Sequence, residues 1–325
     1  MNISREKLLE EAAVTGFRAE MLEKVIKLLG LLEGFHNHPA LKGRLALKGG
    51  TALNLFIFDL PRLSIDIDLN YIGAVELSEM KAERPKIEQA IIAVCKRDGF
   101  NIRRTLKEHA GGKWQLNFQS ELGQNSNLEV DVNFLLRAPL WTPVKMDSKL
   151  IGDFKVSNVN VLDIHELTAG KIVALLARKA SRDLFDVHKI LTTEKLNQEK
   201  LRLAFVVYAG INRVDFRRVS VEDVDFKLSE LKNQLMPVLR ADMALSPKDF
   251  TKWVEKIIEE CRHRLEIVLP YKDNELEFLN RLLDKGEIVP DLLTDDEGLA
   301  EIIRFHSGLK WKALNVCKYS ERLNP

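Results

Sequence analysis

Cysteine is scarce in this chain of 325 residues, which holds only Cys95, Cys261 and Cys317. The three are scattered and form no C-x-x-C pair, so neither a disulfide framework nor a zinc cluster is expected. No run approaches the roughly 18 apolar residues of a membrane-spanning helix, and the charged N-terminal segment lacks the apolar core of a signal peptide. The sequence therefore predicts a soluble, cytoplasmic protein with reduced thiols and no membrane partner.

An excess of one charge is also lacking, because 49 Lys and Arg residues are balanced by 48 Asp and Glu residues. A nucleic-acid partner would have to bind a local patch, since the field of the whole molecule is nearly neutral. Basic residues in 101–109 and 211–219 are candidates for such a patch, although runs of this kind are more often solvated faces. Hydrophobic residues make up 46% of the chain, which is typical of a globular protein.

Hydrophobic periodicity divides the chain into a mixed first part and a helical second part. We expect an α+β fold, with a mixed sheet and flanking helices in domain 1–158 and a mainly helical domain in 159–325. The segment 51–60 is predicted to be a helix capped by Thr51 and ended by Pro61. Residues 163–192 are predicted to be helical, opened by Asp163 with Glu166 in a near capping box. Further helices are expected over 5–13, 18–38 and 76–98, and strands over 44–50, 63–72, 100–107, 113–120 and 127–136, the last three as a meander.

The strand 63–72 carries two acids on one face. Asp66 and Asp68 alternate with Ile65, Ile67 and Leu69, so their side chains project together, about 6.6–7 Å apart along the strand. Two such carboxylates repel each other unless a cation lies between them, and carboxylate oxygens suit Mg²⁺. A lone Asp-x-Asp is weak evidence, because it also fits a polar surface strand.

A third acid and a glycine pair strengthen the interpretation. Asp131 lies between Val130 and Val132 in a later strand, so it can join the first two acids across the sheet, with Glu129 and Asn133 as alternatives. Gly49, Gly50 and Thr51 form a strand-to-helix turn whose backbone N–H groups can approach a phosphate. A lone turn of this type is usually structural. Phosphate beside a metal-holding acid set is the layout of a nucleotidyl-transfer site.

Two ordered signatures carry a family resemblance. "LKGGTALNLFIFDLPRLSIDIDL" at 47–69 resembles the polymerase β-like nucleotidyltransferase superfamily and, more narrowly, the AbiEii/AbiGii toxin family, whose R-x-S-x-D-x-D pattern is filled by Arg62, Ser64, Asp66 and Asp68. "ELTAGKIVALLARKASRDLFDV" at 166–187 is similar to the family's lysine helix and R-D-x-x-D element. The positions that fill it are Lys171, Arg178, Arg182, Asp183 and Asp186.

The resemblance implies a toxin of a type IV toxin–antitoxin or phage-defence system. Such an enzyme transfers a nucleotide from an NTP with Mg²⁺ or Mn²⁺, with tRNA 3′ ends as the acceptor of some members, and is neutralised by a cognate antitoxin. It further implies that Asp66, Asp68 and Asp131 hold the metal and that Ser64 joins Gly49, Gly50 and Thr51 at the nucleotide. Rival interpretations are transfer to a protein or small-molecule hydroxyl, and a nucleotide-binding module without catalysis.

The second signature has a physical account of its own. Lys171 and Arg178 are seven residues apart, about 20° from eclipsed on a helix, so both can face triphosphate oxygens. The alternative is that both are solvated helix positions. One of the two acids that follow can orient Lys171 or Arg178, or act as base toward the incoming hydroxyl. Asp183 is favoured for this role with Lys171, and Asp186 is the second candidate. Asp183 as a helix cap and Asp186 as an ion-pair partner of Arg182 remain open.

Overall fold

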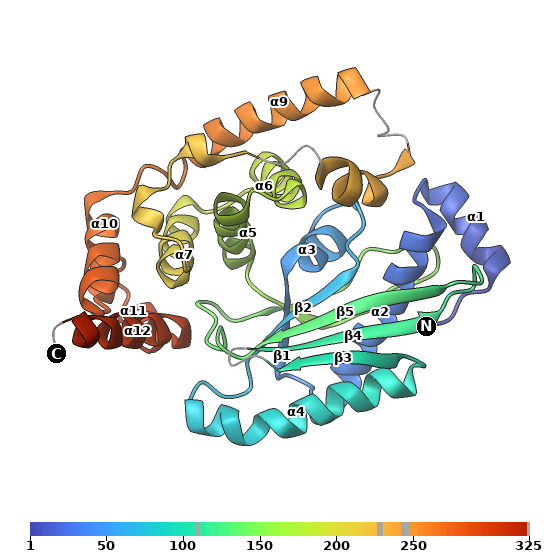
Figure 1. Cartoon of the computed structure of the whole chain (residues 1–325), viewed down its shortest axis with the longest axis horizontal. Helices are drawn as coiled ribbons and strands as arrows, with labels where there is room; N and C mark the ends of the chain where they lie inside the picture. The colour runs from blue at the N-terminus through green and yellow to red at the C-terminus, as the bar shows by residue number, and fades with distance from the viewer. Residues whose placement is uncertain (108–110, 226–229, 242–246, 324–325) are drawn as a thin grey trace. The chain divides into compact units, whose positions relative to one another are not determined.

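The computed structural model describes residues 1–107, 111–225, 230–241 and 247–323 (Figure 1). The chain divides into two compact units that are interleaved in sequence. Unit 1 comprises Met1–Arg137, Pro143–Leu162 and Lys232–Leu245, and unit 2 comprises Ala138–Thr142, Asp163–Leu231 and Ser246–Pro325. The division into independent domains 1–158 and 159–325 stays a prediction.

Unit 1 is built on a mixed sheet of seven strands in the order β3-β4-β5-β2-β1-β7-β6. The pair β2–β5 and the pair β1–β7 are parallel, and the other neighbours are antiparallel. The expected meander is confirmed as β3-β4-β5. The strands are β1 (Leu45–Lys48), β2 (Asp66–Tyr71), β3 (Asn101–Lys107), β4 (Gly111–Gln119), β5 (Asn125–Asn133), β6 (Val144–Met146) and β7 (Val159–Val161).

Helices cover the apolar face of this sheet. Ile67, Trp114 and Val130 are fully buried there, and α2 and α4 pack against the sheet and each other (Figure 1). Ser4 caps α1 as its side chain accepts from the N–H of Lys7 at 3.3 Å. The helices of unit 1 are α1 (Arg5–Thr15), α2 (Ala19–Asn37), α3 (Gly49–Ala52) with its π-helical continuation η1 (Leu53–Ile57), and α4 (Leu77–Arg97).

Local details of unit 1 differ from expectation in three places. The helix after β1 begins at Gly49 with Lys48 as its N-cap, so Thr51 is not the cap. Gly111 and Gly112 belong to β4 rather than to a turn. The strands β6 and β7 were not expected, because three residues are too short to show alternation.

Unit 2 is helical. Its α-helices are α5 (Ile164–Arg178), α6 (Ser181–Thr193), α7 (Gln198–Ile211), α9 (Pro247–Leu265), α10 (Asp273–Asn280), α11 (Glu297–Phe305) and α12 (Ser307–Leu323). A single helical stretch over 163–192 was wrong, because Lys179 adopts the left-handed conformation with φ +56° and separates α5 from α6. Short turns of 3₁₀ or π type complete the described chain at Phe216–Arg218, Val221–Asp223, Leu231–Leu235, Met236–Val238, Arg281–Lys285 and Pro290–Leu292.

The start of α5 does not form the capping box that the sequence suggested. Asp163 is the N-cap and accepts from the N–H of His165 at 2.8 Å, as expected. Glu166 does not return to the cap. Its buried carboxyl accepts from the N–H groups of Leu140 and Trp141 and from the hydroxyl of Tyr208, at 3.0–3.3 Å.

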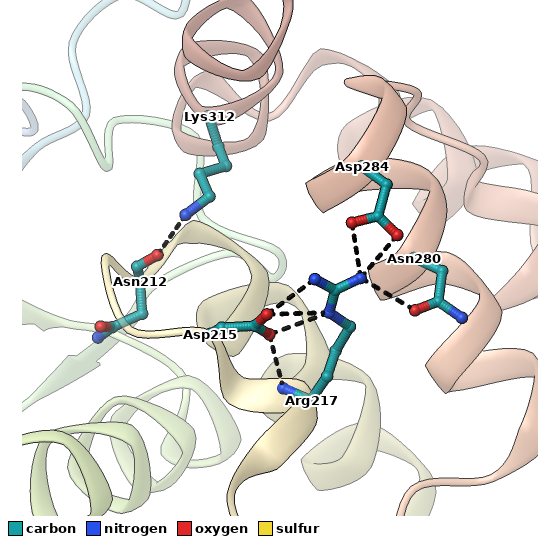
Figure 2. Close-up of polar contacts among 6 residues, drawn as sticks. All are labelled: Asn212, Asp215, Arg217, Asn280, Asp284 and Lys312. Carbon is teal, nitrogen blue, oxygen red and sulfur yellow. Dashed lines mark hydrogen bonds and ion pairs between the residues drawn. The ribbon is translucent and has the colours of Figure 1, made fainter. Parts of the chain in front are cut away.

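An arginine ties two short turns of unit 2 together. Arg217 bonds both carboxylate oxygens of Asp215 and reaches Asp284 at 2.7 Å and Asn280 at 3.2 Å (Figure 2). Lys312 on α12 donates to the carbonyl of Asn212 at 2.6 Å in the same view. Hydrogen bonds to a charged group are stronger than those between neutral groups, so these contacts fix the turns at Phe216–Arg218 and Arg281–Lys285.

Membrane insertion by a helix finds no support in the part of the chain that the structure describes. None of those helices is both long and apolar enough to cross a bilayer.

Candidate active site

The acids predicted on two strands meet in unit 1. Because β2 and β5 pair in parallel register, Asp68 lies directly opposite Asp131, and Asp66 lies opposite Glu129. Neighbouring strands are about 4.8 Å apart. Ile67, Val130 and Val132 are buried on the other face, so the carboxylates share the partly exposed face. The prediction that Asp131 joins the first two acids across the sheet is confirmed, whereas Ile65 precedes the strand and is only half-buried.

The two alternatives to Asp131 are engaged elsewhere. Glu129 accepts from Lys113 Nζ at 2.7 Å and from Gln115 Nε2 at 3.1 Å. Burial alone would raise the pKa of Glu129, but these two hydrogen bonds outweigh it and hold the pKa below its ordinary value. Asn133 Oδ1 accepts from the N–H groups of Leu135 and Leu136, both at 2.8 Å, and so orders the chain after β5. Asp131 is the better third acid because it lies directly opposite Asp68 in the register of β2 and β5.

The glycine turn lies against the acids. Gly49 follows β1, whose Lys48 pairs with Asp68 across the strands. Gly49 has a φ of +72°. A Cβ on Gly49 would collide with the Asp68 carboxylate and lie 3.1 Å from Asp68 Cβ. Glycine is thus needed here both for the backbone conformation and for room beside Asp68. The N–H groups of the first turn of a helix have no intrahelical partner, so Gly49, Gly50 and Thr51 present donors beside the acids.

The hydroxyls of this region face protein. Thr51 is fully buried and donates to the carbonyl of Asp66, and its Oγ1 shares a hydrogen bond of 3.0 Å with Ser64 Oγ. These bonds fasten α3 to the start of β2. Arg62 is also buried, and its guanidinium donates to the carbonyl of Leu63 at 2.8 Å. The positions of Thr51, Ser64 and Arg62 fix the acid strand, and direct contact of their side chains with a nucleotide stays a prediction.

Unit 2 contains a buried ionic cluster built on the second signature. Lys171 Nζ on α5 lies 2.9 Å from both Asp183 Oδ1 and Asp186 Oδ2 on α6, and both carboxylates are buried. Arg178 Nε reaches Asp183 Oδ2 at 2.6 Å, although the Arg178 side chain is 64% exposed. The sharp turn at Lys179 is what brings α6 back onto the lysine face of α5.

These distances decide between some of the roles that the sequence left open for Asp183, Asp186 and Lys171. Asp183 and Asp186 contact Lys171 at the same distance, so the acid favoured from sequence and its rival share the task of holding the lysine. Asp183 is not the cap of α6, because Ala180 occupies that position. Burial would raise the pKa of Asp183, but the charge of Lys171 and the hydrogen bond from Arg178 hold it below its ordinary value. Lys171 is buried, so the solvated-position alternative is wrong for it.

Three polar residues of β4 share the acid face of the sheet and were not predicted from the sequence as site residues. Lys113, Gln115 and Asn117 alternate with buried Trp114 and Leu116 along β4. The alternation itself was the available signal, because it puts these three side chains on one face beside β5. Their partners on β5 follow only from the register of the pair.

No group of three or more His, Cys, Asp and Glu side chains stands ready to hold a metal within the described ranges. Mg²⁺ does not require one, since it is commonly bound by one or two carboxylates together with waters and substrate phosphates. Asp68 and Asp131, opposite each other, fit that donor set. Gly49 leaves the room in which the Asp68 carboxylate lies.

Comparisons with known proteins agree with the fold. The nucleotidyltransferase toxin MenT4 from Mycobacterium tuberculosis superposes with a TM-score of 0.65 over 93% of this chain and 100% of its own, at 17% sequence identity. No curated protein matches the chain in sequence. The family described as nucleotidyl transferase AbiEii toxin, type IV TA system, matches residues 30–260, which is more than two thirds of the chain and includes both signatures. The chain belongs to this family of nucleotidyltransferase toxins of type IV toxin–antitoxin systems.

Proposed function

We propose that this toxin, with a divalent cation bound, transfers a nucleotide from an NTP to an RNA 3′ hydroxyl, and that the transfer takes place on the acid face of unit 1. The observation that carries the proposal is the register of β2 and β5, which puts Asp68 opposite Asp131 beside the turn at Gly49. Two facing carboxylates and a helix start that offers N–H donors suit a cation and a phosphate together.

Asp68 and Asp131 would hold Mg²⁺ or Mn²⁺, with Asp66 as a further ligand. A cation bound there neutralises charge on the phosphoryl group under attack. The N–H groups of Gly49, Gly50 and Thr51 bind the phosphates that leave, and Ser64 supports that turn from behind.

The proposed transfer needs no reactant besides the NTP and the acceptor. The acceptor hydroxyl oxygen forms a bond to the α-phosphorus, and the bond from this phosphorus to the oxygen bridging to the β-phosphate breaks. Pyrophosphate leaves with the bonding electron pair. The hydroxyl proton passes to a carboxylate of the acid face, for which Asp131 is the candidate, and then to solvent.

Lys171 and Arg178 are proposed to stabilise the triphosphate, as the family pattern implies. Support comes from the way the lysine is held, because Asp183 and Asp186 fix its ammonium group in one position. Arg178 extends a largely exposed guanidinium from the same cluster, and a planar guanidinium suits phosphate oxygens. Asp183 is then a positioning residue for both cations.

The proposed acceptor is the 3′ end of tRNA, so that transfer blocks translation until a cognate antitoxin neutralises the toxin. The support for the antitoxin is family membership, since type IV toxin–antitoxin systems pair a toxin with an antitoxin. The tRNA acceptor is what the resemblance of the two sequence signatures implies.

The test is incubation with each labelled NTP, Mg²⁺ and total tRNA, followed by separation of RNA, protein and small-molecule fractions. Label should enter the RNA fraction and be abolished by EDTA. Asp68→Asn and Asp131→Asn should each lower the transfer rate at least about 100-fold, because each removes a charged metal ligand.

The matched control is Asp59→Asn, whose fully exposed carboxylate lies outside the acid face. It should transfer at the wild-type rate. Label in the protein or small-molecule fraction would identify another acceptor. Metal-dependent NTP binding without transfer to any fraction would instead favour a binding module and overturn the proposal.

A further inference from the structure

A polar hollow of about 240 Å³ opens on the acid face of unit 1, beside Asp66. It is smaller than the roughly 300–1,000 Å³ of pockets that take drug-sized ligands, so it suits a single nucleoside-sized group. The side chains that matter for its chemistry are Asp66, Arg103, Gln115, Asn117, Asn127 and Glu129.

Strand register explains why three carboxamides gather there. Across β4 and β5, Lys113 pairs with Asp131. The next two pairs on the same face, moving along the strands, are Gln115 with Glu129 and then Asn117 with Asn127. All of these side chains lie on the face opposite buried Leu116 and Leu128. The hollow therefore continues the acid face along β5 from Asp131 to Asn127, and it extends across the sheet to Arg103 on β3.

The carboxamides present a defined set of donors and acceptors. Gln115 uses Nε2 on Glu129 at 3.1 Å, which leaves its Oε1 to accept. Asn127 Oδ1 accepts from Lys24 Nζ at 2.9 Å, which leaves its Nδ2 to donate. Asn117 makes no side-chain hydrogen bond to any described residue and can do both. Such amides recognise the edges of nucleic-acid bases and ribose hydroxyls.

The direction of the reaction points to the same place. In nucleotidyl transfer the attacking and leaving oxygens lie roughly in line on opposite sides of the phosphorus. Across the sheet the strands follow the order β4-β5-β2-β1, so Asp68 and Asp131 lie between the glycine turn after β1 and the part of the hollow that Gln115 and Asn117 form on β4. If the glycine turn holds the leaving phosphates, the acceptor hydroxyl must come from the side of the hollow.

We propose that this hollow binds the 3′-terminal nucleoside of the RNA acceptor, with Asn117, Gln115 and Asn127 contacting its base edge and ribose. The inference rests on the proposed function and adds the residues that select the acceptor end. Arg103 lies at a register shift between Ile102 and Arg104 in β3, where an irregularity can redirect a side chain toward the hollow. Its guanidinium binds the phosphate that precedes the terminal nucleoside.

The experiment measures acceptor and NTP separately in Asn117→Ala. Steady-state transfer gives KM for a short single-stranded RNA and KM for the NTP, and anisotropy of the same RNA, labelled at its 5′ end, gives its affinity without NTP. The variant should raise KM and Kd for the RNA about 5- to 100-fold, the usual effect of losing base-edge contacts. KM for the NTP should stay unchanged within about twofold.

Two further variants test whether the effect is specific to the hollow. Gln119→Ala removes an exposed amide from the same strand and the same face, outside the hollow, and should bind RNA like the wild type. Arg103→Ala should lower the slope of log affinity against log salt by about 1, as expected for one phosphate contact. Circular dichroism and thermal melting confirm that each variant is folded.

The outcomes distinguish this inference from the function on which it rests. A higher KM for the NTP in place of the RNA would mean that the hollow holds the nucleotide base, and would overturn the inference while the transfer reaction stands. Unchanged constants for both substrates would also overturn it. RNA binding that depends on Asn117 in a protein that transfers no label would support the hollow and contradict the transfer reaction.

Discussion

Gly49 meets two requirements that no other residue satisfies together. Its φ is +72°, and any Cβ there would collide with the carboxylate of Asp68. We expect Gly49→Ala to lower the free energy of unfolding by roughly 1–3 kcal/mol, the usual cost of such backbone strain. Because the alanine displaces the proposed metal ligand Asp68, transfer should also fall at least about 100-fold, since a shift of about 1 Å at a reacting centre can have that effect. Urea unfolding and the labelled-NTP assay measure the two effects.

Gly43→Ala separates backbone strain from the collision. Gly43 has a φ of +75°, but a Cβ there would meet nothing within 4 Å. This variant should lose about 1–2 kcal/mol of stability, the cost of a left-handed conformation for an L-residue, and keep wild-type transfer. Equal loss of activity in both variants would show that strain, and not the room beside Asp68, accounts for the need for Gly49.

Single residues of the acid face were predictable where a strand pattern exposed them. Asp68 and Asp131 each alternate with buried apolar neighbours, so both could be placed on a polar face from local sequence alone. That Glu129 is engaged by Lys113 could not be predicted, because the contact depends on the register of β4 against β5. Thr51 was mistaken for a cap for the same reason, since its partner Asp66 lies on another element.

The pairing of α5 with α6 depends on one lysine. Lys171 contacts two buried carboxylates, and removing one partner of a buried ion pair leaves uncompensated charge. We expect Lys171→Met to lower the free energy of unfolding by about 3–5 kcal/mol. Urea unfolding followed by circular dichroism measures this change. Adding Asp183→Asn should recover part of the loss, because one buried charge disappears with it.

Arg178→Ala is the matched control within the same cluster. It removes a cation from Asp183 as well, but the Arg178 side chain is 64% exposed and water screens its charge. The expected loss is below about 1 kcal/mol. Similar losses in Arg178→Ala and Lys171→Met would contradict the importance of burial in this cluster.

Elements were predictable in proportion to their length and periodicity. The helices α1, α2 and α4 and the meander β3-β4-β5 follow from patterns that extend over many residues. The break between α5 and α6 was missed because Lys179, and not glycine or proline, adopts the left-handed conformation. Strand β7 was missed because it pairs with β1 only through Leu47 and Val161, which are far apart in sequence.

At the scale of the whole chain, sequence order and spatial units do not coincide. The segment Ala138–Thr142 belongs to unit 2 although unit 1 resumes at Pro143. Glu166 is the residue that holds this segment, since it accepts from the N–H groups of Leu140 and Trp141. A local helix-cap pattern suggested a different partner for Glu166, because the segment it binds is about 25 residues away in sequence.

Glu166 should also set a pH dependence of the stability of the whole protein. Burial raises the pKa of its carboxyl from 4.5 to about 7, against the opposing hydrogen bonds from Leu140, Trp141 and Tyr208. Between these two pKa values the folded protein holds a proton that the unfolded chain has released. The free energy of unfolding attributable to Glu166 is therefore highest below about pH 4.5 and falls as the pH rises through 7, by about 3 kcal/mol in total.

The expected result is a difference between wild type and Glu166→Gln that changes with pH. The glutamine stays neutral, so its curve should lack the decline that the wild type shows between about pH 4.5 and pH 7. Urea unfolding at a series of pH values measures both curves, and subtraction cancels the titration of groups common to both, including Asp163 beside Glu166. Parallel curves would show that the pKa of Glu166 is the same in the folded and the unfolded protein. In that case its three hydrogen bonds offset the effect of burial.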